Sequence, residues 1–493
     1  MLPSIVANEL RTAIARFLRS AFPIATTYFQ RKEKGGDDAL ALIDDLIARD
    51  GALFKGPYLD IKLPFRKADA ALPFQHITLP FVPYKHQLTA FQRLGGTAPQ
   101  STIVATGTGS GKTECFMLPV LDDCLQRRER GIKTLVVYPM NALATDQAKR
   151  FAKEVEKIKA EQGVQLSVGL FVGSDGGAEQ HVAMGPDHVI TDHNTLRKNP
   201  PDILLTNYKM LDFLLIRPKD QPLWRYNKPG FLRYLVVDEL HTFDGAQGTD
   251  LACLIRRLRD RLDAGPELAC VGTSATMGSG SKAPLVAYAS KVFATEFDEQ
   301  GVIGEDRLTP TEYLPAQENI EYAQWPDRDE RRLNPEQYDS VREFVFHQAR
   351  LWFPELPVDE LSGLNSSDEA QQQAASVRLG ELLRRHSVFH ELVHSAGQVQ
   401  DLNELAERWY RHMGLPSHAQ ALSLINSLTA LVSTARVWRN QHAKTLADRC
   451  GPFLELRVQL WLRELRRLVS TVPNEVDGRS QLVFSDDEAG ESD

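Results

Sequence analysis

Cysteine is scarce and scattered in this chain of 493 residues. The five cysteines lie far apart, and no two of them form a Cys-x-x-Cys pair. Zinc ribbons and most iron–sulfur clusters need such closely spaced ligands, so the sequence argues against both kinds of site. Scattered cysteines are typical of proteins whose thiols stay reduced, and we therefore expect a cytoplasmic location.

Long apolar runs are also missing. No uninterrupted run approaches the roughly 18 apolar residues that a membrane-spanning helix requires. The first residues, Met1-Leu2-Pro3-Ser4, lack the basic flank and the cleavage site of a signal peptide. The sequence therefore predicts a protein that is not embedded in a membrane.

The chain has no strong excess of one charge. It carries 57 basic and 65 acidic residues, which gives a formal net charge of −8. A protein with this balance can hold a nucleic-acid backbone only through local basic patches. The net charge therefore neither supports nor excludes a nucleic-acid partner.

What the chain does contain, from about residue 81 to 318, is an alternation of short apolar runs with helical patterns. Near-continuous apolar strands between helices indicate a parallel sheet that helices cover on both faces. In such α/β folds, ligands bind at the carboxyl ends of the strands. The expected strands are Thr102–Ala105, Thr134–Tyr138, Leu166–Phe171, Asp202–Thr206, Leu235–Asp238 and Leu268–Gly272.

Different patterns flank this α/β region. Residues 1–80 are expected to form an N-terminal extension with an amphipathic helix over Ile5–Phe22. Residues 319–485 are expected to form a mainly helical domain, and residues 486–493 an acidic, disordered tail. The clearest helical spacing in the C-terminal region is that of Leu454, Val458, Trp461, Leu465 and Leu468.

A glycine-rich loop follows the first expected strand, with the sequence Thr106-Gly107-Thr108-Gly109-Ser110-Gly111-Lys112-Thr113. Its glycines let backbone N–H groups converge on phosphate oxygens at the start of a helix. Lys112 would bridge the β- and γ-phosphates of ATP, and the Thr113 hydroxyl would ligate Mg²⁺. Thr106 departs mildly from the strict pattern, which has Gly or Ala there. The residues expected to bind nucleotide are Thr108, Gly109, Ser110, Gly111, Lys112 and Thr113.

Two further motifs follow later expected strands. In Asp238-Glu239-Leu240-His241, Asp238 would hold Mg²⁺ and Glu239 would orient or deprotonate the attacking water. Ser274-Ala275-Thr276 could relay the nucleotide state through its hydroxyl groups. Each motif alone is weak, because a polar strand end or a simple turn would explain it. Their order along one expected sheet favours a nucleotide-driven motor, with Lys112, Asp238 and Glu239 as catalytic residues.

Together these residues resemble the first RecA-like domain of a superfamily-two DExH helicase. Pro83-Tyr84-Lys85-His86-Gln87 is similar to the motif that reads adenine, which implies that role for Gln87. The resemblance also implies ATP and Mg²⁺ as cofactors. The residues that it assigns to nucleic-acid binding are Pro139, Asn141, Thr206 and Asn207, and those that it assigns to coupling are His241, Ser274 and Thr276.

Longer stretches of sequence resemble a smaller group within this superfamily. The stretches YPMNALA, PPDILLTNYKMLD and DELHTFDGAQGTDLACLIRRL resemble large prokaryotic helicases of DNA repair and phage defence, of the mitomycin-repair, Druantia or DISARM kind. The resemblance is strong over about 81–318, suggestive over about 50–80 and weak beyond. It implies DNA rather than RNA as the partner.

Such motors close a second RecA-like domain over the nucleotide and bring an arginine finger from a Gln-x-x-Gly-Arg-x-x-Arg motif. No such motif follows Thr276. We therefore expect one half of an ATP-dependent DNA helicase or translocase, with weak hydrolysis on its own, completed by a second RecA-like domain or a partner chain. Two alternatives remain open, namely an ATP-binding interaction module without unwinding activity and an RNA helicase.

The last feature is a basic stretch between Arg436 and Arg467, with eight basic residues against three acidic ones. It could form a surface that faces DNA. The solvated face of an amphipathic helix is the favoured explanation. We expect Trp438 and Trp461 in this stretch to lie in the core.

Overall fold

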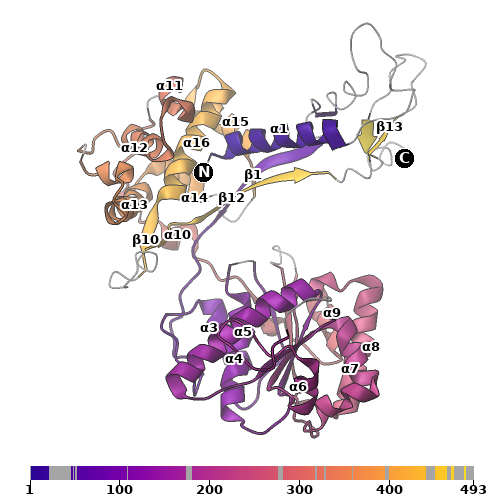
Figure 1. Cartoon of the computed structure of the whole chain (residues 1–493). Helices are drawn as coiled ribbons and strands as arrows, with labels where there is room; N and C mark the ends of the chain where they lie inside the picture. Colours follow the sequence, from indigo (N-terminus) through magenta and orange to yellow (C-terminus); the bar gives the residue numbers. More distant parts are fainter. Residues whose placement is uncertain are drawn as a thin grey trace. The chain divides into compact units, whose positions relative to one another are not determined.

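The computed structural model describes residues 2–21, 46–47, 49, 53–107, 109–173, 180–275, 281–316, 319–326, 329–357, 359–394, 399–439, 450–463, 468–470 and 482–484. The chain divides into two compact units. One unit is Phe65–Arg307, and the other combines Met1–Pro64 with Leu308–Asp493. Figure 1 draws both units.

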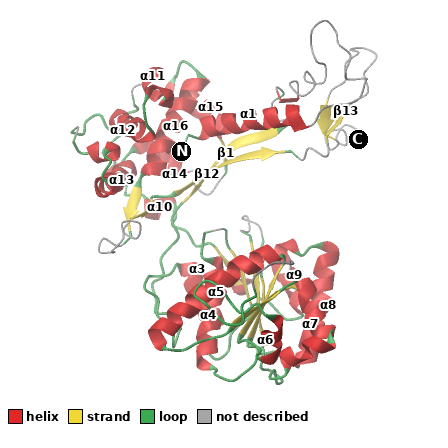
Figure 2. Cartoon of the chain, in the orientation of Figure 1, coloured by secondary structure: helices red, strands yellow, loops and turns green. Residues whose placement is uncertain are grey.

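The unit Phe65–Arg307 is built on a sheet of seven parallel strands in the order β4-β5-β3-β6-β7-β2-β8 (Figure 2). This confirms the predicted α/β class with a parallel sheet. The edge strand β8 was not among the expected strands, because it is only three residues long. The strands are β2 (Thr102–Ala105), β3 (Thr134–Tyr138), β4 (Val168–Phe171), β5 (Ile203–Asn207), β6 (Tyr234–Val237), β7 (Ala269–Ser274) and β8 (Val302–Gly304).

Helices cover both faces of this sheet (Figure 1). Strand β3 shows why, since Val136 and Tyr138 pack with α4 and α5, whereas Leu135 and Val137 pack with α7 and α8. Alternate side chains of a strand point to opposite faces, so a strand that is apolar throughout needs helices on both sides. One layer comprises α3 (Lys85–Leu94), α4 (Lys112–Gln126) and α5 (Asn141–Gln162), and the other α7 (Tyr208–Ile216), α8 (Gly245–Leu262) and α9 (Ala283–Phe293).

Shorter elements complete this unit, and an ion pair with a buried lysine joins two of its strands. Lys133 is fully buried, and its Nζ lies 2.5 Å from Asp202 Oδ1 and 2.6 Å from the Glu129 carbonyl oxygen. The pair ties the start of β3 to the start of β5. The short elements are α6 (His193–Lys198) and the 3₁₀ turns η1 (Pro218–Trp224), η2 (Leu240–Thr242) and η3 (Glu299–Gly301).

The other unit joins the two ends of the sequence through a small sheet. Strand β1 (Phe54–Lys62) pairs antiparallel with both β12 (Glu455–Leu462) and β9 (Gln400–Asp401). Helix α1 (Pro3–Ala21) matches the amphipathic helix predicted over Ile5–Phe22. Because β1 is bonded to strands from the C-terminal region, the compact units divide the chain after residues 64 and 307.

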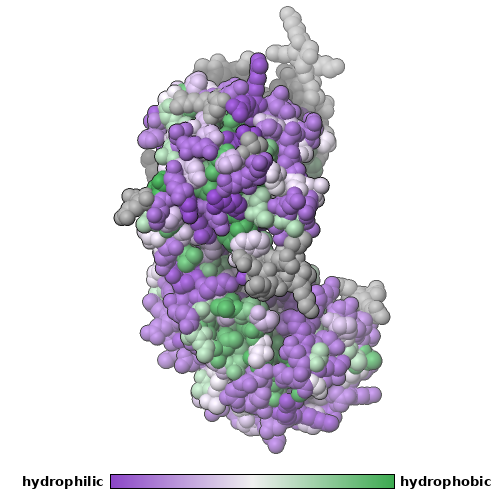
Figure 3. Space-filling model, turned by 90° about the vertical axis from the view of Figure 1, so that its left-hand side faces the viewer, coloured by the Kyte–Doolittle hydropathy of each residue, from purple (hydrophilic) through white to green (hydrophobic). Residues whose placement is uncertain are grey.

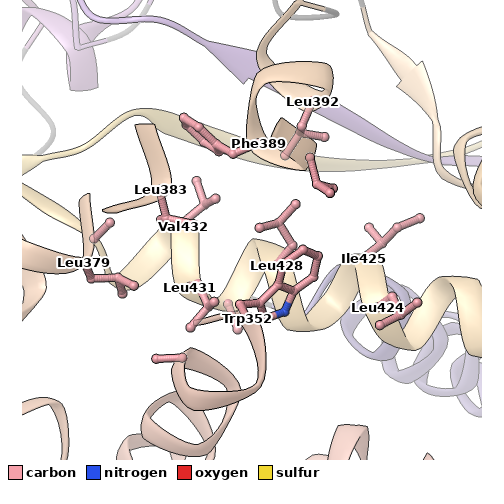
Figure 4. Close-up of a cluster of buried hydrophobic side chains, with 14 of the residues drawn as sticks. Trp352, Leu379, Leu383, Phe389, Leu392, Leu424, Ile425, Leu428, Leu431 and Val432 are labelled. Carbon is pink, nitrogen blue, oxygen red and sulfur yellow. The ribbon is translucent and has the colours of Figure 1, made fainter. Parts of the chain in front are cut away.

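Helices dominate the C-terminal part of this unit, as predicted, and bury a common core (Figure 4). The Trp352 ring lies among Leu428, Leu431 and their neighbours, and its indole N–H donates to Ser427 Oγ at 2.8 Å. The main helices are α12 (Val341–Trp352), α13 (Glu369–Arg384), α14 (Ser387–His394), α15 (Leu402–Met413) and α16 (His418–Thr434). The remaining elements are α10 (Pro310–Tyr313), α11 (Glu330–Leu333), η5 (Pro335–Gln337), η6 (Ser362–Asn365), β10 (Arg436–Trp438), β11 (Cys450–Pro452), β13 (Leu468–Ser470) and β14 (Leu482–Phe484).

One buried histidine belongs to this core. His386 is fully buried, with its ring 5.3 Å from that of Trp352 and 5.5 Å from that of Phe353. Its Nδ1 accepts a hydrogen bond from the Val388 N–H at 3.2 Å. Burial disfavours the charged imidazolium and lowers the pKa of His386 to about 4.

The helix expected from the spacing of Leu454, Val458 and Trp461 is wrong, because residues 455–462 form strand β12. The same stretch also has apolar residues at every second position, and pairing with β1 selects that period. Trp438 and Trp461 are 40% and 62% exposed, so the expectation that they lie in the core is wrong too. Four basic residues of the stretch between Arg436 and Arg467 lie outside the described residues, namely Lys444, Arg449, Arg466 and Arg467. The predicted acidic tail 486–493 lies outside them as well.

Among the residues that the structure describes, no helix is long and apolar enough to cross a bilayer. The face drawn in Figure 3 is mostly polar, with an apolar area on the unit Phe65–Arg307. Large exposed apolar side chains occur in both units, among them Phe17, Phe81 and Met140. All five cysteines are free thiols.

Candidate nucleotide-binding site

The fold brings the three sequence motifs to one edge of the parallel sheet. The glycine-rich loop follows β2, the Asp-Glu-Leu-His tetrapeptide follows β6, and the Ser-Ala-Thr triplet begins at the last residue of β7. These strands are adjacent in the order β6-β7-β2. Because parallel strands all end at the same edge, motifs that are far apart in sequence meet there.

The glycine-rich loop adopts a backbone that favours glycine. Gly109 and Gly111 have φ angles of 81° and 77°, in the left-handed region that other residues rarely adopt. Ser110 is fully buried, and its Oγ donates to Thr106 Oγ1 at 2.8 Å or to the Gly107 carbonyl at 2.7 Å. Helix α4 begins directly after the loop, so its N-terminal N–H groups face the same edge. This arrangement suits an anionic phosphate chain.

The lysine of the loop contacts the acidic motif. Lys112 Nζ lies 2.7 Å from Glu239 Oε1 and 3.3 Å from the Ser274 carbonyl oxygen. Glu239 has a φ of 51°, which costs free energy for a residue with a Cβ and is common at functional sites. The structure therefore joins all three motifs through one ammonium group.

A threonine that the sequence analysis did not select connects the two acids. Thr273 donates its hydroxyl to Asp238 Oδ1 and accepts from the Glu239 N–H at 3.0 Å. Asp238 is buried, and desolvation raises the pKa of its carboxyl, while the bond from Thr273 opposes that shift. In the sequence, the only sign of this role is that Thr273 carries a hydroxyl group directly before Ser274. The contacts with Asp238 and Glu239 arise because β7 pairs with β6.

Thr113 and Asp238 are the predicted magnesium ligands. The Thr113 hydroxyl donates to Gln147 Oε1 at 3.2 Å and accepts from Arg150 Nη1 at 3.0 Å. Arg150 also pairs with Glu114 at 3.1 Å. A hydroxyl and a carboxylate are hard oxygen donors of the kind that Mg²⁺ prefers, so the residues at this edge fit the ion chemically.

The predicted coupling residues His241 and Ser274 also meet. His241 Nδ1 lies 3.4 Å from Ser274 Oγ, 3.4 Å from Glu239 Oε2 and 3.3 Å from the Ala275 backbone nitrogen. His241 therefore bridges the acidic motif and the triplet. Thr108 and Thr276 lie outside the described residues.

The first turn of α3 contacts the phosphate loop. Gln87, the predicted adenine reader, accepts from the Tyr84 N–H at 2.9 Å and donates to the Gly111 carbonyl at 3.3 Å. Its neighbour His86, which the sequence analysis passed over, lies with Nε2 2.9 Å from the Ser110 carbonyl oxygen. His86 is buried, and desolvation lowers its pKa. Two consecutive side chains thus bind two carbonyl groups of the phosphate loop.

The residues expected to contact nucleic acid lie at the ends of β3 and β5. Asn207 Nδ2 donates to Asn141 Oδ1 at 2.5 Å, and Asn207 Oδ1 caps α7 by accepting from the Met210 N–H. The Thr206 hydroxyl is buried and donates to the Phe171 carbonyl at 2.7 Å, while Pro139 is half-buried before α5. The asparagines are thus held together, and the role of all these residues in nucleic-acid binding stays a prediction.

A separate hollow lies between α8 and α9. Its volume is about 350 Å³, and its lining includes Gly248, Cys253, Tyr288 and Lys291. No residue of the three motifs lines it. We therefore do not assign it to the nucleotide.

Comparison with known proteins agrees with this geometry. The sequence profile of the DEAD/DEAH box helicase family matches residues 84–283. The Druantia protein DruE of Escherichia coli (strain UMEA 4076-1) is 24% identical over 45% of this chain and 17% of its own length. The ATP-dependent helicase YprA of Bacillus subtilis (strain 168) is 30% identical over 36% of this chain and 20% of its own.

Among solved structures, the crystal structure of the DUF1998 helicase MrfA is 28% identical, with a TM-score of 0.34, over 45% of this chain and 30% of that chain. The matches span about a fifth of the length of the curated relatives named above.

Proposed function

We propose that the chain binds ATP and hydrolyses it to move along nucleic acid, because the DEAD/DEAH box helicase family profile matches residues 84–283. The unit Phe65–Arg307 acts as one half of this motor. The nucleic acid is DNA, and a second RecA-like domain, in the same protein or in a partner, completes the motor.

One observation carries the proposal, namely the 2.7 Å contact between Lys112 Nζ and Glu239 Oε1. The lysine belongs to a loop suited to phosphates, and the carboxylate is the expected base for the attacking water. When they meet at the edge where strands of an α/β sheet bind ligands, a positive charge and a base converge on one position. A γ-phosphate at that position would be neutralised on one side and approached by water on the other.

The residues divide the chemistry as follows. Backbone N–H groups of the loop bind the phosphate oxygens, and Lys112 exchanges its carboxylate partner for the γ-phosphate. Glu239, released from the lysine, orients the attacking water and accepts its proton. Bound Mg²⁺, held by Thr113 and Asp238, would supply positive charge against the phosphate oxygens. Thr273 keeps the two acids in register by its bonds to both.

We propose DNA as the nucleic-acid partner because of three stretches of sequence. The stretches that begin at Tyr138, Pro201 and Asp238 resemble helicases of DNA repair and phage defence. Asn141 and Asn207 are the residues expected to contact the nucleic acid. They follow the ends of the neighbouring β-strands β3 and β5. An RNA helicase is the alternative outcome, and comparison of single-stranded DNA with RNA of the same length separates the two.

A second function, an ATP-binding interaction module, is favoured by the form of the other sheets. In the described part of the chain, parallel strands pair only in the seven-stranded sheet, and all other sheets are antiparallel. These residues therefore offer no second RecA-like sheet to bring an arginine finger. A missing finger costs about a thousandfold or more in turnover. The 493-residue chain should then bind ATP but hydrolyse it slowly.

The experiment measures nucleotide binding and hydrolysis separately. Lys112→Ala should abolish binding of a fluorescent ATP analogue with Mg²⁺, because it removes the charge closest to the phosphates. Glu239→Gln should keep binding but block single-turnover hydrolysis, since an amide is a poor proton acceptor. Lys153→Ala and Glu161→Gln, at exposed positions of α5, are the matched controls. Equal analogue affinity of Lys112→Ala and the parent would refute the assignment.

A titration with single-stranded DNA tests the motor role. Binding should be weak and should fall steeply between roughly 50 and 200 mM salt, because phosphate contacts release counterions. Addition of a second RecA-like domain should restore DNA-stimulated turnover. No DNA binding at the lowest salt, with ATP present, would leave the interaction module as the better description. Turnover of several per second by the chain alone would show that a finger is already present.

A further inference from the structure

The chain passes between its two compact units at residues 64/65 and 307/308, and the two passages are bonded to each other. Phe65 and Arg307 form an antiparallel bridge. The Arg66 N–H donates to the Asp306 carbonyl at 2.9 Å, and the Leu308 N–H donates to the Pro64 carbonyl at 3.0 Å. We call residues 64–66 and 306–308 the crossing ribbon. Its two segments are hydrogen-bonded to each other around one isolated bridge.

Side chains reinforce the crossing ribbon. Arg66 Nε lies 2.9 Å from Asp306 Oδ1. The guanidinium carbon of Arg307 lies 3.8 Å from the centre of the Phe65 ring, a cation–π contact between the two segments. A substitution in either segment of the ribbon therefore removes a contact of the other segment.

Glu305, directly before the ribbon, connects it to the phosphate loop. Glu305 Oε2 lies 2.5 Å from Arg307 Nε, and Oε1 accepts from the Gly107 N–H at 2.8 Å. The Glu305 and Arg307 side chains are only 11% and 16% exposed, so water screens these charges little. Hydrogen bonds to a charged acceptor are among the stronger ones in proteins. The first glycine of the loop is thus tied to the ribbon through one carboxylate.

A second connection reaches the loop by another route. The Phe65 ring lies 5.1 Å from the His86 ring, and His86 Nε2 lies 2.9 Å from the Ser110 carbonyl oxygen. The ribbon therefore contacts the loop at two positions, Gly107 through Glu305 and Ser110 through His86. Only two residues lie between those positions, so the two connections together restrain the path of the loop.

On these contacts, we propose that Glu305 is a positioning residue for ATP and links occupancy of the phosphate loop to the crossing ribbon through Arg307. The proposal rests on ATP binding as proposed above. Phosphate oxygens bind several loop N–H groups at once, and that removes alternative loop conformations. A loop held in one conformation keeps the Gly107 N–H and the Ser110 carbonyl in place for their partners. The ribbon then opens less often.

Hydrogen exchange of the full chain tests this inference, with and without a non-hydrolysable ATP analogue and Mg²⁺. In the parent, the analogue should slow exchange of the Arg66 and Leu308 amides, which donate the bonds of the ribbon. In Glu305→Ala the analogue should bind about tenfold or more weakly, since a charged hydrogen bond is lost. At saturating analogue, its ribbon amides should no longer respond. Glu296→Ala, which removes an exposed carboxylate, should behave as the parent.

Glu305→Gln separates the two bonds of the carboxylate, because an amide oxygen can still accept from the Gly107 N–H but carries no charge for Arg307. Its affinity for the analogue should stay within about threefold of the parent, while the exchange response of the ribbon falls. If Glu305→Ala does not fold, this variant carries the test.

Two outcomes would overturn the inference in distinguishable ways. If the parent fails to bind the analogue, the proposed function fails and this inference fails with it. If the parent binds the analogue but the ribbon amides exchange at the same rate with and without it, the inference alone is refuted. A Glu305→Ala response equal to that of the parent refutes it as well.

Discussion

Replacement of Gly111 by alanine should weaken ATP binding far more than the same change two residues earlier. Gly111 has a φ of +77°, and a Cβ at this position would lie 2.1 Å from Gln87 Nε2. The alanine must therefore bear backbone strain, and it must also displace the Gln87 amide. That amide accepts from Tyr84 at 2.9 Å and donates to the Gly111 carbonyl at 3.3 Å.

The magnitude follows from the two costs. A residue with a Cβ in the left-handed region costs about 1–2 kcal/mol. Loss of the two Gln87 hydrogen bonds costs about 0.5–1.5 kcal/mol each, so the total is about 2–5 kcal/mol. This free energy favours loop conformations that do not bind phosphate and lowers the competent fraction. The apparent Kd for ATP should rise by about 30-fold to a few thousandfold.

Gly109→Ala is the matched control. Gly109 has a φ of +81°, but no atom lies within 4 Å of the position that its Cβ would take. Only the backbone strain applies, so the Kd should rise by about 5- to 30-fold. In a Gln87→Ala background the clash at Gly111 is gone, and Gly111→Ala should then cost no more than Gly109→Ala does. The two effects of Gly111 and Gln87 should therefore be strongly non-additive.

The assay is equilibrium titration of each variant with a fluorescent ATP analogue and Mg²⁺, with urea unfolding as a check on global stability. Equal loss of affinity in Gly109→Ala and Gly111→Ala would refute the steric part of the reasoning. Additive behaviour of Gly111→Ala and Gln87→Ala would show that the amide does not occupy this position in the binding-competent loop.

Three further predictions concern groups away from the glycines. Thr273→Val should leave ATP affinity nearly unchanged but lower single-turnover hydrolysis about tenfold or more, since a hydrogen bond to a charged group is worth about 1.5–3 kcal/mol; Thr273→Ser should restore the rate, and an unchanged rate in the valine variant would exclude a positioning role. Lys133→Met should lower the free energy of unfolding by about 1.5–3 kcal/mol in urea, because Asp202, whose side chain is 21% exposed, loses a charged hydrogen bond; an unchanged free energy of unfolding would show that water replaces the lysine. His386 has a folded pKa of about 4, below the unfolded value near 6.5, so the unfolded chain binds the proton first and stability falls as the pH drops from 6.5 toward 4. The loss should be about 2 kcal/mol by pH 5, and His386→Asn should lack this part of the pH dependence; equal pH profiles of parent and variant would contradict the assignment.

The parallel sheet and the motifs could be predicted because their signals are local. An apolar run such as Thr134–Tyr138 predicts a strand that is buried on both faces, and β3 has the same bounds. The spacing Gly-x-Gly-Lys-Thr predicts a phosphate loop before a helix, and α4 begins at Lys112. Since parallel strands end at one edge, even the meeting of Lys112 with Glu239 follows from the order of the motifs.

Other parts depended on contacts between distant residues. Thr273 and Glu305 belong to no recognisable sequence motif. Thr273 has its role because β7 lies beside β6, and Glu305 has its role because it follows β8 and bonds to the phosphate loop. The stretch Glu455–Leu462 fits both a helical and a strand period.

The sequence by itself determined the fold class, the position of the phosphate loop and the acids at its edge, because each of these depends on side chains a few residues apart. The tertiary structure alone decided that β12 is a strand, that residues 54–62 belong with the C-terminal region, and that Glu305 holds the loop. These features depend on backbone and side-chain partners that lie far away along the chain. No local period specifies such partners, since a strand or a carboxylate gains its hydrogen bonds only when the chain has folded around it.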